Sequence, residues 1–171
     1  MEQLFVMDLK DYDDSYTRFV RPSVRGVIIA DGKIAMVYSK KHDYYKFPGG
    51  GIEKNEDKIS ALKRELLEET GLTLIENSIE ELGSVLRIQK SRFAENEIFE
   101  QENFYYMCKV NDRVTDQLLD IYESDEGFTL EYVSPQHALT VNRFHFHGDY
   151  DEMLIEREAK VLDYLCEKGF I

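Results

Sequence analysis

This sequence has few cysteines, and those it has are not placed for cross-linking. Cys108 and Cys166 are its two cysteines among 171 residues, and neither lies in a CxxC or zinc-ligand spacing. The spacing argues against a disulfide framework and a structural zinc site, so two buried, reduced thiols are the simplest interpretation. A chain of this length forms a hydrophobic core without such cross-links. We expect one domain over residues 1–171.

Basic residues are also in short supply. The chain has 21 Lys and Arg against 34 Asp and Glu, which gives a formal net charge of -13. A nucleic-acid polymer needs many basic partners for its phosphates, so we expect no such polymer as a partner. A small nucleotide stays compatible with this charge, because a metal ion can bridge its phosphates to carboxylates.

Long apolar runs are absent as well. No stretch reaches the length of a membrane span, and the start MEQLFVMDLKDYDD has no basic segment ahead of an apolar one. We therefore expect no membrane partner, a cytoplasmic location, and a monomer or homodimer.

The pattern of apolar and turn residues predicts a mixed α/β chain. Asp31-Gly32 is typical of a hairpin turn between two strands. The polar stretch 111–127 is expected to be irregular, and a final helix is expected from Asp149. The predicted strands cover 18–30, 33–39, 82–88, the aromatic segment that ends at 110, and 128–134.

A central helix is predicted over residues 57–69, followed by Gly71 as its C-terminal cap. Ile59, Leu62 and Leu66 recur at helical spacing and form its apolar stripe. A short helix or turn is expected to begin at Pro135.

Three glutamates, Glu65, Glu68 and Glu69, share this helix within about 100° of arc. Like charges at such spacing weaken a helix by a few tenths of a kcal/mol each, and more when partly buried. Lys58 and Lys63 are the nearest ammonium groups, and we expect only Lys58 to point toward the glutamates. A hard divalent cation takes oxygen ligands and would relieve the repulsion.

A glycine-rich loop, FPGGG at residues 47–51, leads into this helix. Glycine lets the backbone turn sharply and approach a ligand closely. Gly50 is therefore a candidate substrate contact, together with Phe47, which can also anchor the loop in the core. Arg64 can hold the glutamates in one rotamer by bidentate pairing, or contact a phosphate.

These residues together resemble the Nudix box without a departure from its spacing. The likeness extends over about residues 18 to 140, through the strands on either side. The matching positions are Gly50, Glu56, Arg64-Glu65-Leu66, Glu68-Glu69 and Gly71-Leu72.

The resemblance implies an α/β/α sandwich, with a mixed curved sheet, a central loop-helix-loop and a C-terminal helix. It also implies hydrolysis, dependent on Mg²⁺ or Mn²⁺, of a nucleoside diphosphate linked to another moiety. Glu65, Glu68 and Glu69 would then be metal ligands, with the Gly49 carbonyl as a further one. Glu65 would also assist the attacking water, and Arg64 would orient Glu65.

In many relatives a further acid comes from a loop before a late strand. Glu126 is our first choice for this role, with Glu123 and Asp125 as close alternatives and Glu102 as a weaker one. A solvated surface acid is the competing interpretation of each.

Aromatic and basic side chains are candidates for holding the nucleotide. Five aromatic residues could stack on a base, although core packing is the more frequent role of such residues: Tyr44, Tyr45, Phe104, Tyr105 and Tyr106. Four arginines could reach phosphate, Arg25 foremost, if they are not simply solubilising: Arg21, Arg25, Arg87 and Arg92.

Markers of several substrate classes are absent. Arg87 stands where ADP-ribose hydrolases of the family often have a proline, the tyrosine typical of diadenosine polyphosphate hydrolases is missing at 88–90, and the chain has no Trp for the NADH-hydrolase signature. Elimination leaves a nucleoside triphosphate, including oxidised forms, as the default substrate. One alternative is a regulatory module that binds a nucleotide derivative without hydrolysis, although such modules usually have an eroded box. Prenyl diphosphate isomerisation would ask for a cysteine near the glycine loop, where neither cysteine lies.

Overall fold

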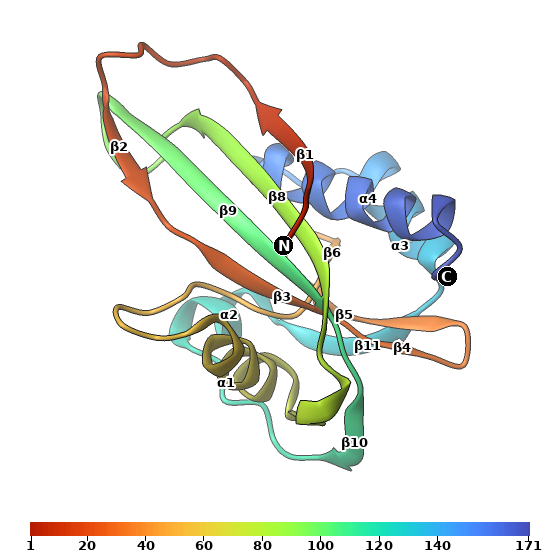
Figure 1. Ribbon diagram of the computed structural model, residues 1–171. Coiled ribbons are helices and arrows are strands. Elements are labelled where there is room, and N and C mark those ends of the chain that lie inside the picture. Colours follow the sequence, from red (N-terminus) through yellow and green to blue (C-terminus); the bar gives the residue numbers. More distant parts are fainter.

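A computed structural model describes the backbone of residues 1–171, and the side chains of all of them except residues 112–114. Helix α1 (Lys58–Thr70) lies on one side of the strands, and α3 (Pro135–Phe144) and α4 (Glu152–Glu167) lie together on the other (Figure 1). This layering confirms the predicted α/β/α sandwich with a C-terminal helix. None of the described helices is long and apolar enough to cross a membrane.

The largest sheet is mixed. Its order is β1 (Gln3–Asp8), β8 (Glu80–Lys90), β9 (Glu97–Met107) and β2 (Thr17–Val20), and β3 (Ser23–Val27) also pairs with β9. Strands β8 and β9 are antiparallel, whereas β1, β2 and β3 run parallel to their partners. The predicted strand at 18–30 is thus interrupted at Pro22, which has no N–H to donate to the ladder.

A second sheet carries the predicted hairpin. Strands β4 (Ile29–Ala30) and β5 (Lys33–Ser39) pair antiparallel across Asp31-Gly32, whose φ angles are 51° and 71°. Strand β11 (Thr129–Val133) pairs with β5 on its other side, and β6 (Tyr44–Lys46) also pairs with β5. Strand β7 (Leu72–Leu74) pairs with β10 (Val110–Val114). The hairpin and the strand expected at 128–134 are therefore confirmed.

The central helix follows from local signals. The Asp57 side chain accepts hydrogen bonds from the N–H groups of Ile59 and Ser60 at 3.0 Å each, which caps α1 at its start. Leu62 and Leu66 are fully buried, in a core cluster that also contains Val24 of β3. The predicted helix and its apolar stripe are confirmed.

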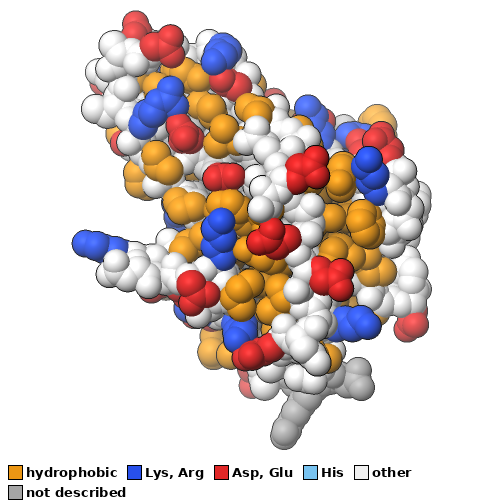
Figure 2. Space-filling view, in the orientation of Figure 1, with side chains coloured by type: hydrophobic (Ala, Val, Ile, Leu, Met, Phe, Trp, Pro, Cys, Tyr) orange, Lys and Arg blue, Asp and Glu red, His pale blue; other side chains and the backbone are white. Residues whose placement is uncertain are grey.

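The polar stretch 111–127 is more regular than expected. It contains the end of β10 and a short helix, α2 (Ile121–Glu126), which Asp120 and Glu123 begin with reciprocal side-chain to backbone hydrogen bonds of 2.8 and 2.9 Å. Strand β1 and the short 3₁₀ helix η1 (Glu76–Ser78) were not predicted either. On the face seen in Figure 2, acidic side chains are scattered between hydrophobic ones, as the negative net charge leads one to expect.

Candidate active site

The glycine loop is held against strand β3 and helix α1. Gly49 has a φ of 133°, and a Cβ there would collide with the Val24 carbonyl oxygen. A Cβ at Gly50 would collide with the carboxylate of Glu65. The Val24 N–H donates to the Gly50 carbonyl at 3.0 Å, and the Gly26 N–H to the carbonyl of Pro48 at 2.8 Å. The loop needs glycine because the Glu65 carboxylate occupies the space that a side chain would fill.

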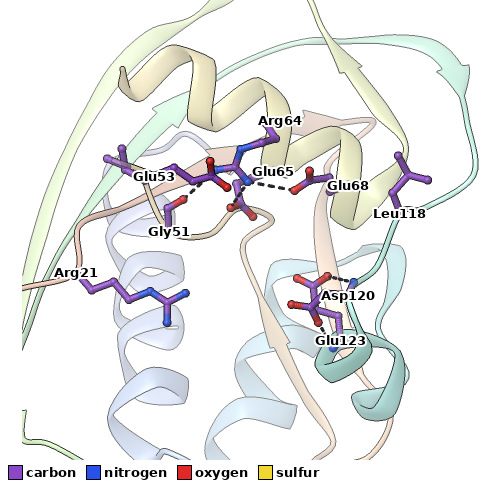
Figure 3. A pocket seen from close by; sticks show the side chains of 10 residues that line it. Arg21, Gly51, Glu53, Arg64, Glu65, Glu68, Leu118, Asp120 and Glu123 are labelled. Atoms are coloured by element: carbon purple, nitrogen blue, oxygen red, sulfur yellow. Dashed lines mark hydrogen bonds and ion pairs between the residues drawn. The ribbon is translucent and has the colours of Figure 1, made fainter. Parts of the chain in front are cut away.

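Arg64, in the middle of α1, forms hydrogen bonds with three carboxylates. Its Nη1 donates to Glu65 Oε1 at 2.7 Å and to Glu68 Oε2 at 3.1 Å (Figure 3). Its Nε and Nη2 each donate to Glu56 at 2.9 Å, and Nη2 also donates to the Gly51 carbonyl at 3.0 Å. This bidentate geometry fixes the guanidinium in one plane. The predicted pairing of Arg64 with the box glutamates is present.

Glu69 has a basic partner that the sequence did not suggest. Lys46 of β6 forms an ion pair with Glu69, and the Gly49 N–H donates to the other carboxylate oxygen at 2.8 Å. The expectation that Lys58 would point toward the glutamates is wrong, because its ammonium lies over the Phe104 ring, 3.3 Å from the centroid. Lys63 pairs with Glu76 at 2.5 Å.

Burial governs the electrostatics of Glu65. Burial raises the pKa of its carboxyl above the ordinary value, and the neighbouring Glu69 carboxylate adds to this, against the opposing hydrogen bond from Arg64. The hydrogen bond from Arg64 lowers the pKa of Glu56. Burial and the nearby Glu69 thus make the negative charge of the Glu65 carboxylate unfavourable, and a cation beside this carboxylate would stabilise it.

The candidate metal donors are engaged by basic side chains. Within the described part of the chain, no group of three or more His, Cys, Asp or Glu side chains is already close enough to hold one. Glu65 and Glu68 are turned to Arg64, Glu69 to Lys46, and the Gly49 carbonyl accepts from Arg25. All candidate donors are oxygen atoms, however, and Mg²⁺ and Mn²⁺ prefer such donors. The donor chemistry fits a hard divalent ion, and the side-chain arrangement is that of charges neutralised by Arg and Lys.

Two adjoining cavities lie beside these residues. Four residues line both: Arg21, Gly51, Asp120 and Glu123. The first, of about 370 Å³, is further lined by Ile52, Glu53, Arg64, Glu65, Glu68 and Leu118 (Figure 3). The second, of about 570 Å³, reaches Gly49, Gly50 and Glu69 at one end and Arg87, Phe93, Phe99 and Leu154 elsewhere on its wall. A polar cavity at the glutamates thus continues into one with aromatic and basic walls.

Glu126, the first choice for the further acid, lies outside both cavities. It is 1% exposed, and its Oε2 accepts from Ser39 Oγ at 3.0 Å and from the Tyr44 hydroxyl at 3.3 Å. Its Oε1 has no hydrogen-bond partner among the described residues. Glu126 as the further acid therefore stays a prediction: it contacts Tyr44, which lines the second cavity, but lines neither cavity itself.

Glu123 is the alternative that faces the cavities. It lines both, and burial raises the pKa of its carboxyl to about 7, with the Glu69 carboxylate adding to the shift. Asp125 is exposed and Glu102 accepts a hydrogen bond from Ser84 Oγ at 2.9 Å, and neither lines a cavity. A carboxyl that titrates near neutrality can accept a proton from water.

Three of the aromatic candidates for substrate contact are core residues. Phe47, Tyr45 and Tyr106 are 0%, 4% and 3% exposed, and none lines either cavity. The Tyr45 hydroxyl donates to Glu131 at 2.7 Å, on the side of α3. This burial fits core packing, the competing interpretation, and substrate contact by these side chains stays a prediction. Gly50, Arg25 and the aromatic candidate Tyr44 do line the second cavity. Five aromatic residues that the sequence analysis did not single out as contacts line it as well: Phe93, Phe99, Tyr122, Phe128 and Tyr150.

The comparisons with known proteins agree with this geometry. The family model for the NUDIX domain matches residues 20–154. Among curated proteins, the chain is 46% identical over 54 residues to an RNA pyrophosphohydrolase of Halorhodospira halophila, covering 30% of this chain and 29% of that protein. It is 41% identical over 56 residues to an 8-oxo-dGTP diphosphatase of Buchnera aphidicola, covering 30% of this chain and 43% of that protein. The matches thus span well under half the length of these relatives.

Solved structures show the same fold over more of the chain. A NUDIX hydrolase from Nitrosomonas europaea superposes with a TM-score of 0.61 at 20% identity, over 88% of this chain and 91% of that one. A UDP-X diphosphatase superposes with a TM-score of 0.55 at 20% identity, over 90% and 65%. Since the family model covers most of the residues and the fold agrees, the chain belongs to the Nudix family.

Proposed function

We propose that this chain hydrolyses a phosphoanhydride bond in a nucleoside diphosphate linked to another moiety. The observation that supports this most is the grouping of Glu65, Glu68 and Glu69 beside the glycine loop, at the junction of two cavities. The polar cavity suits a diphosphate, and the aromatic and basic one suits the groups attached to it.

Glu65, Glu68, Glu69 and the Gly49 carbonyl would hold Mg²⁺ or Mn²⁺ in this proposal. When bound, such an ion supplies positive charge that neutralises phosphate oxygens and acidifies a water molecule. Arg64 holds Glu65 and Glu68 in place through hydrogen bonds. With an ion and substrate bound, its guanidinium would supply a fixed positive charge near the phosphates.

Two carboxyl groups are suited to take the proton of the attacking water. Glu65 has a raised pKa and lies on the first cavity. Glu123 faces Glu65 across that cavity and has a pKa of about 7 (Figure 3). Glu65 remains our choice for assisting the water, and Glu123 takes the place first given to Glu126.

A nucleoside triphosphate, including oxidised forms, is the substrate we propose. The names of the two curated relatives, an RNA pyrophosphohydrolase and an 8-oxo-dGTP diphosphatase, support a phosphoanhydride within a nucleotide. The net charge of -13 argues against a grip on a longer nucleic-acid chain.

A substrate screen in H₂¹⁸O tests the proposal. The panel contains nucleoside triphosphates, their 8-oxo forms, nucleoside diphosphate sugars and a 5′-triphosphorylated RNA, each with Mg²⁺ and with Mn²⁺. We expect release of phosphate or pyrophosphate, with the label identifying the phosphorus attacked. Glu68→Gln should abolish release, whereas Glu76→Gln, an exposed acid paired with Lys63, should not change it. Binding of a nucleotide with no release from any member of the panel would favour the regulatory module instead.

A further inference from the structure

Two buried arginines line the second cavity, which also reaches Glu69 of α1. Arg87 of β8 and Arg25 of β3 both line this cavity, although they are only 4% and 5% exposed. Three of their nitrogen atoms have no hydrogen-bond partner among the described residues: Arg25 Nε, Arg87 Nε and Arg87 Nη1. Buried donors in folded proteins are nearly always paired, so these three call for an acceptor.

Arg87 contacts one carboxylate and one aromatic ring. Its Nη2 donates to Asp151 at 2.8 Å, and its guanidinium lies over the Phe99 ring, 4.9 Å from the centroid. Burial lowers the pKa of Arg87 to about 10, and the nearby guanidinium groups of Arg157 and Arg25 add to this against the opposing Asp151. Arg87 is thus a buried cation with one carboxylate partner, Asp151, and two other guanidinium groups near it.

The layer between the large sheet and α4 carries one more positive than negative side chain. Arg157 pairs with Glu158, and Arg87 pairs with Asp151. Among the described residues, Arg25 donates to the backbone carbonyls of residues 47 and 49, and its charge also acts on the Glu65 carboxylate. Of the described side chains in this layer, three guanidinium groups therefore share two paired carboxylates, Glu158 and Asp151. An anion in the cavity would balance the charge.

We propose that Arg87 and Arg25 form a subsite for a phosphate group of the substrate that lies outside the scissile diphosphate. This inference rests on the proposed function and narrows it, because the substrate must then carry at least one phosphate beyond the bond that is broken. A phosphate dianion offers several acceptor oxygens in the geometry that a guanidinium fork binds. The group is either the terminal phosphate of a polyphosphate chain or a phosphate monoester on the sugar.

Phosphate binding without metal tests the subsite independently of hydrolysis. Calorimetric titration in EDTA uses inorganic phosphate, a nucleoside 5′-monophosphate and a nucleoside 3′,5′-bisphosphate as probes. We expect binding of all three probes, and Arg87→Gln should weaken it by about tenfold or more, since it removes a charged donor pair. Arg18→Gln, an exposed arginine on β2 that pairs with Glu100, should leave it within about twofold of the original protein.

A second variant, Asp151→Asn, should strengthen phosphate binding, whereas Arg87→Gln should weaken it. Asp151→Asn removes the carboxylate that competes for Arg87, while asparagine still caps α4, which Asp151 caps through the Leu154 N–H. We expect tighter phosphate binding in this variant, which a misfolded protein would not give. Equal binding by the original protein, Arg87→Gln and Asp151→Asn overturns the subsite, and so does an equal loss in Arg18→Gln.

Turnover identifies which phosphate the subsite takes. With Mg²⁺, a selective fall of kcat/KM for nucleoside triphosphates in Arg87→Gln assigns the terminal phosphate. A selective fall for substrates phosphorylated on the sugar assigns the monoester, whereas an equal fall for every substrate overturns the subsite. Hydrolysis combined with phosphate binding that ignores Arg87 refutes the subsite alone. Phosphate binding that depends on Arg87, without hydrolysis of any substrate, refutes the proposed function alone.

Discussion

Replacing Glu69 by glutamine separates the structural role of this residue from its proposed role as a metal ligand. Glu69 is 1% exposed and pairs with Lys46, which is itself 8% exposed. Glutamine keeps an acceptor for the Gly49 N–H but removes the negative charge. Lys46 then stays buried, with the Phe128 ring 4.5 Å from its ammonium and an electrostatic attraction to the Glu123 carboxylate in place of the ion pair.

The expected loss of stability follows from this burial. Removal of one partner of a buried ion pair costs about 3–5 kcal/mol, and contact with the Phe128 ring places Glu69→Gln near the lower end, at about 3 kcal/mol. For a chain of this size, that loss lowers the Tm by about 6–12 °C. Glu68 is different: its side chain is 38% exposed, so Glu68→Gln should cost less than about 1 kcal/mol.

Urea unfolding followed by circular dichroism in EDTA measures these differences. The paired variant Lys46→Met with Glu69→Gln should recover stability to within about 1 kcal/mol of the original protein, because no buried charge is left alone. Both Glu68→Gln and the paired variant should nevertheless be inactive with Mg²⁺. A Glu69→Gln protein within about 1 kcal/mol of the original would refute the buried pair with Lys46.

Three further predictions concern activity and pH. Glu65→Gln should lower kcat by at least about 10²-fold in a steady-state assay of phosphate release, and retention of most of the activity would contradict its role. Gly50→Ala should push the Glu65 carboxylate out of place and reduce turnover, with a Tm shift of less than about 4 °C for roughly 1 kcal/mol. Glu123 has a folded-state pKa of about 7 against an ordinary 4.5, so the folded protein binds more protons than the unfolded chain between these values. In EDTA, stability should therefore fall as pH rises from about 4.5 to 7, and Glu123→Gln should reduce this slope; an unchanged slope would rule out the raised pKa.

The elements predicted best from the sequence are those fixed by neighbours along the chain. Helix α1 has its cap at Asp57, its apolar stripe and its terminating Gly71 within one segment. Strand β1 pairs with β8 across more than 75 residues of chain, and its side chains are mostly half-buried or exposed, so no clear alternation marks it. Helix α2 has six residues, IYESDE, and too few apolar positions to show a helical period.

In the candidate site, too, some contacts follow from neighbours along the chain and others depend on how the elements pack. The box glutamates and Arg64 lie within one helix, where spacing alone brings them together. The pairing of Glu69 with Lys46 depends on how β6 docks against α1 and could not be predicted from spacing. Glu123 and Glu126 are three residues apart, and only the docking of α2 decides which of them faces the cavity.

Buried arginines are the largest departure from expectation. From the sequence, exposed and solubilising side chains are the simpler interpretation of Arg25 and Arg87, since arginine is rarely buried without a partner. In the fold, α4 covers the face of the large sheet from which they project, and Asp151 at its start reaches Arg87. That contact joins residues from distant parts of the chain, so no local sequence pattern predicts it.

Diffraction at the manganese edge from a crystal soaked with Mn²⁺ and a non-hydrolysable nucleoside triphosphate analogue tests the central claim most directly. We predict an anomalous peak bound by carboxylate oxygens of Glu65, Glu68 and Glu69, at roughly 2.0–2.3 Å, with phosphate oxygens completing its coordination. An analogue bound without such a peak, with those carboxylates still paired to Arg64 and Lys46, would contradict the account.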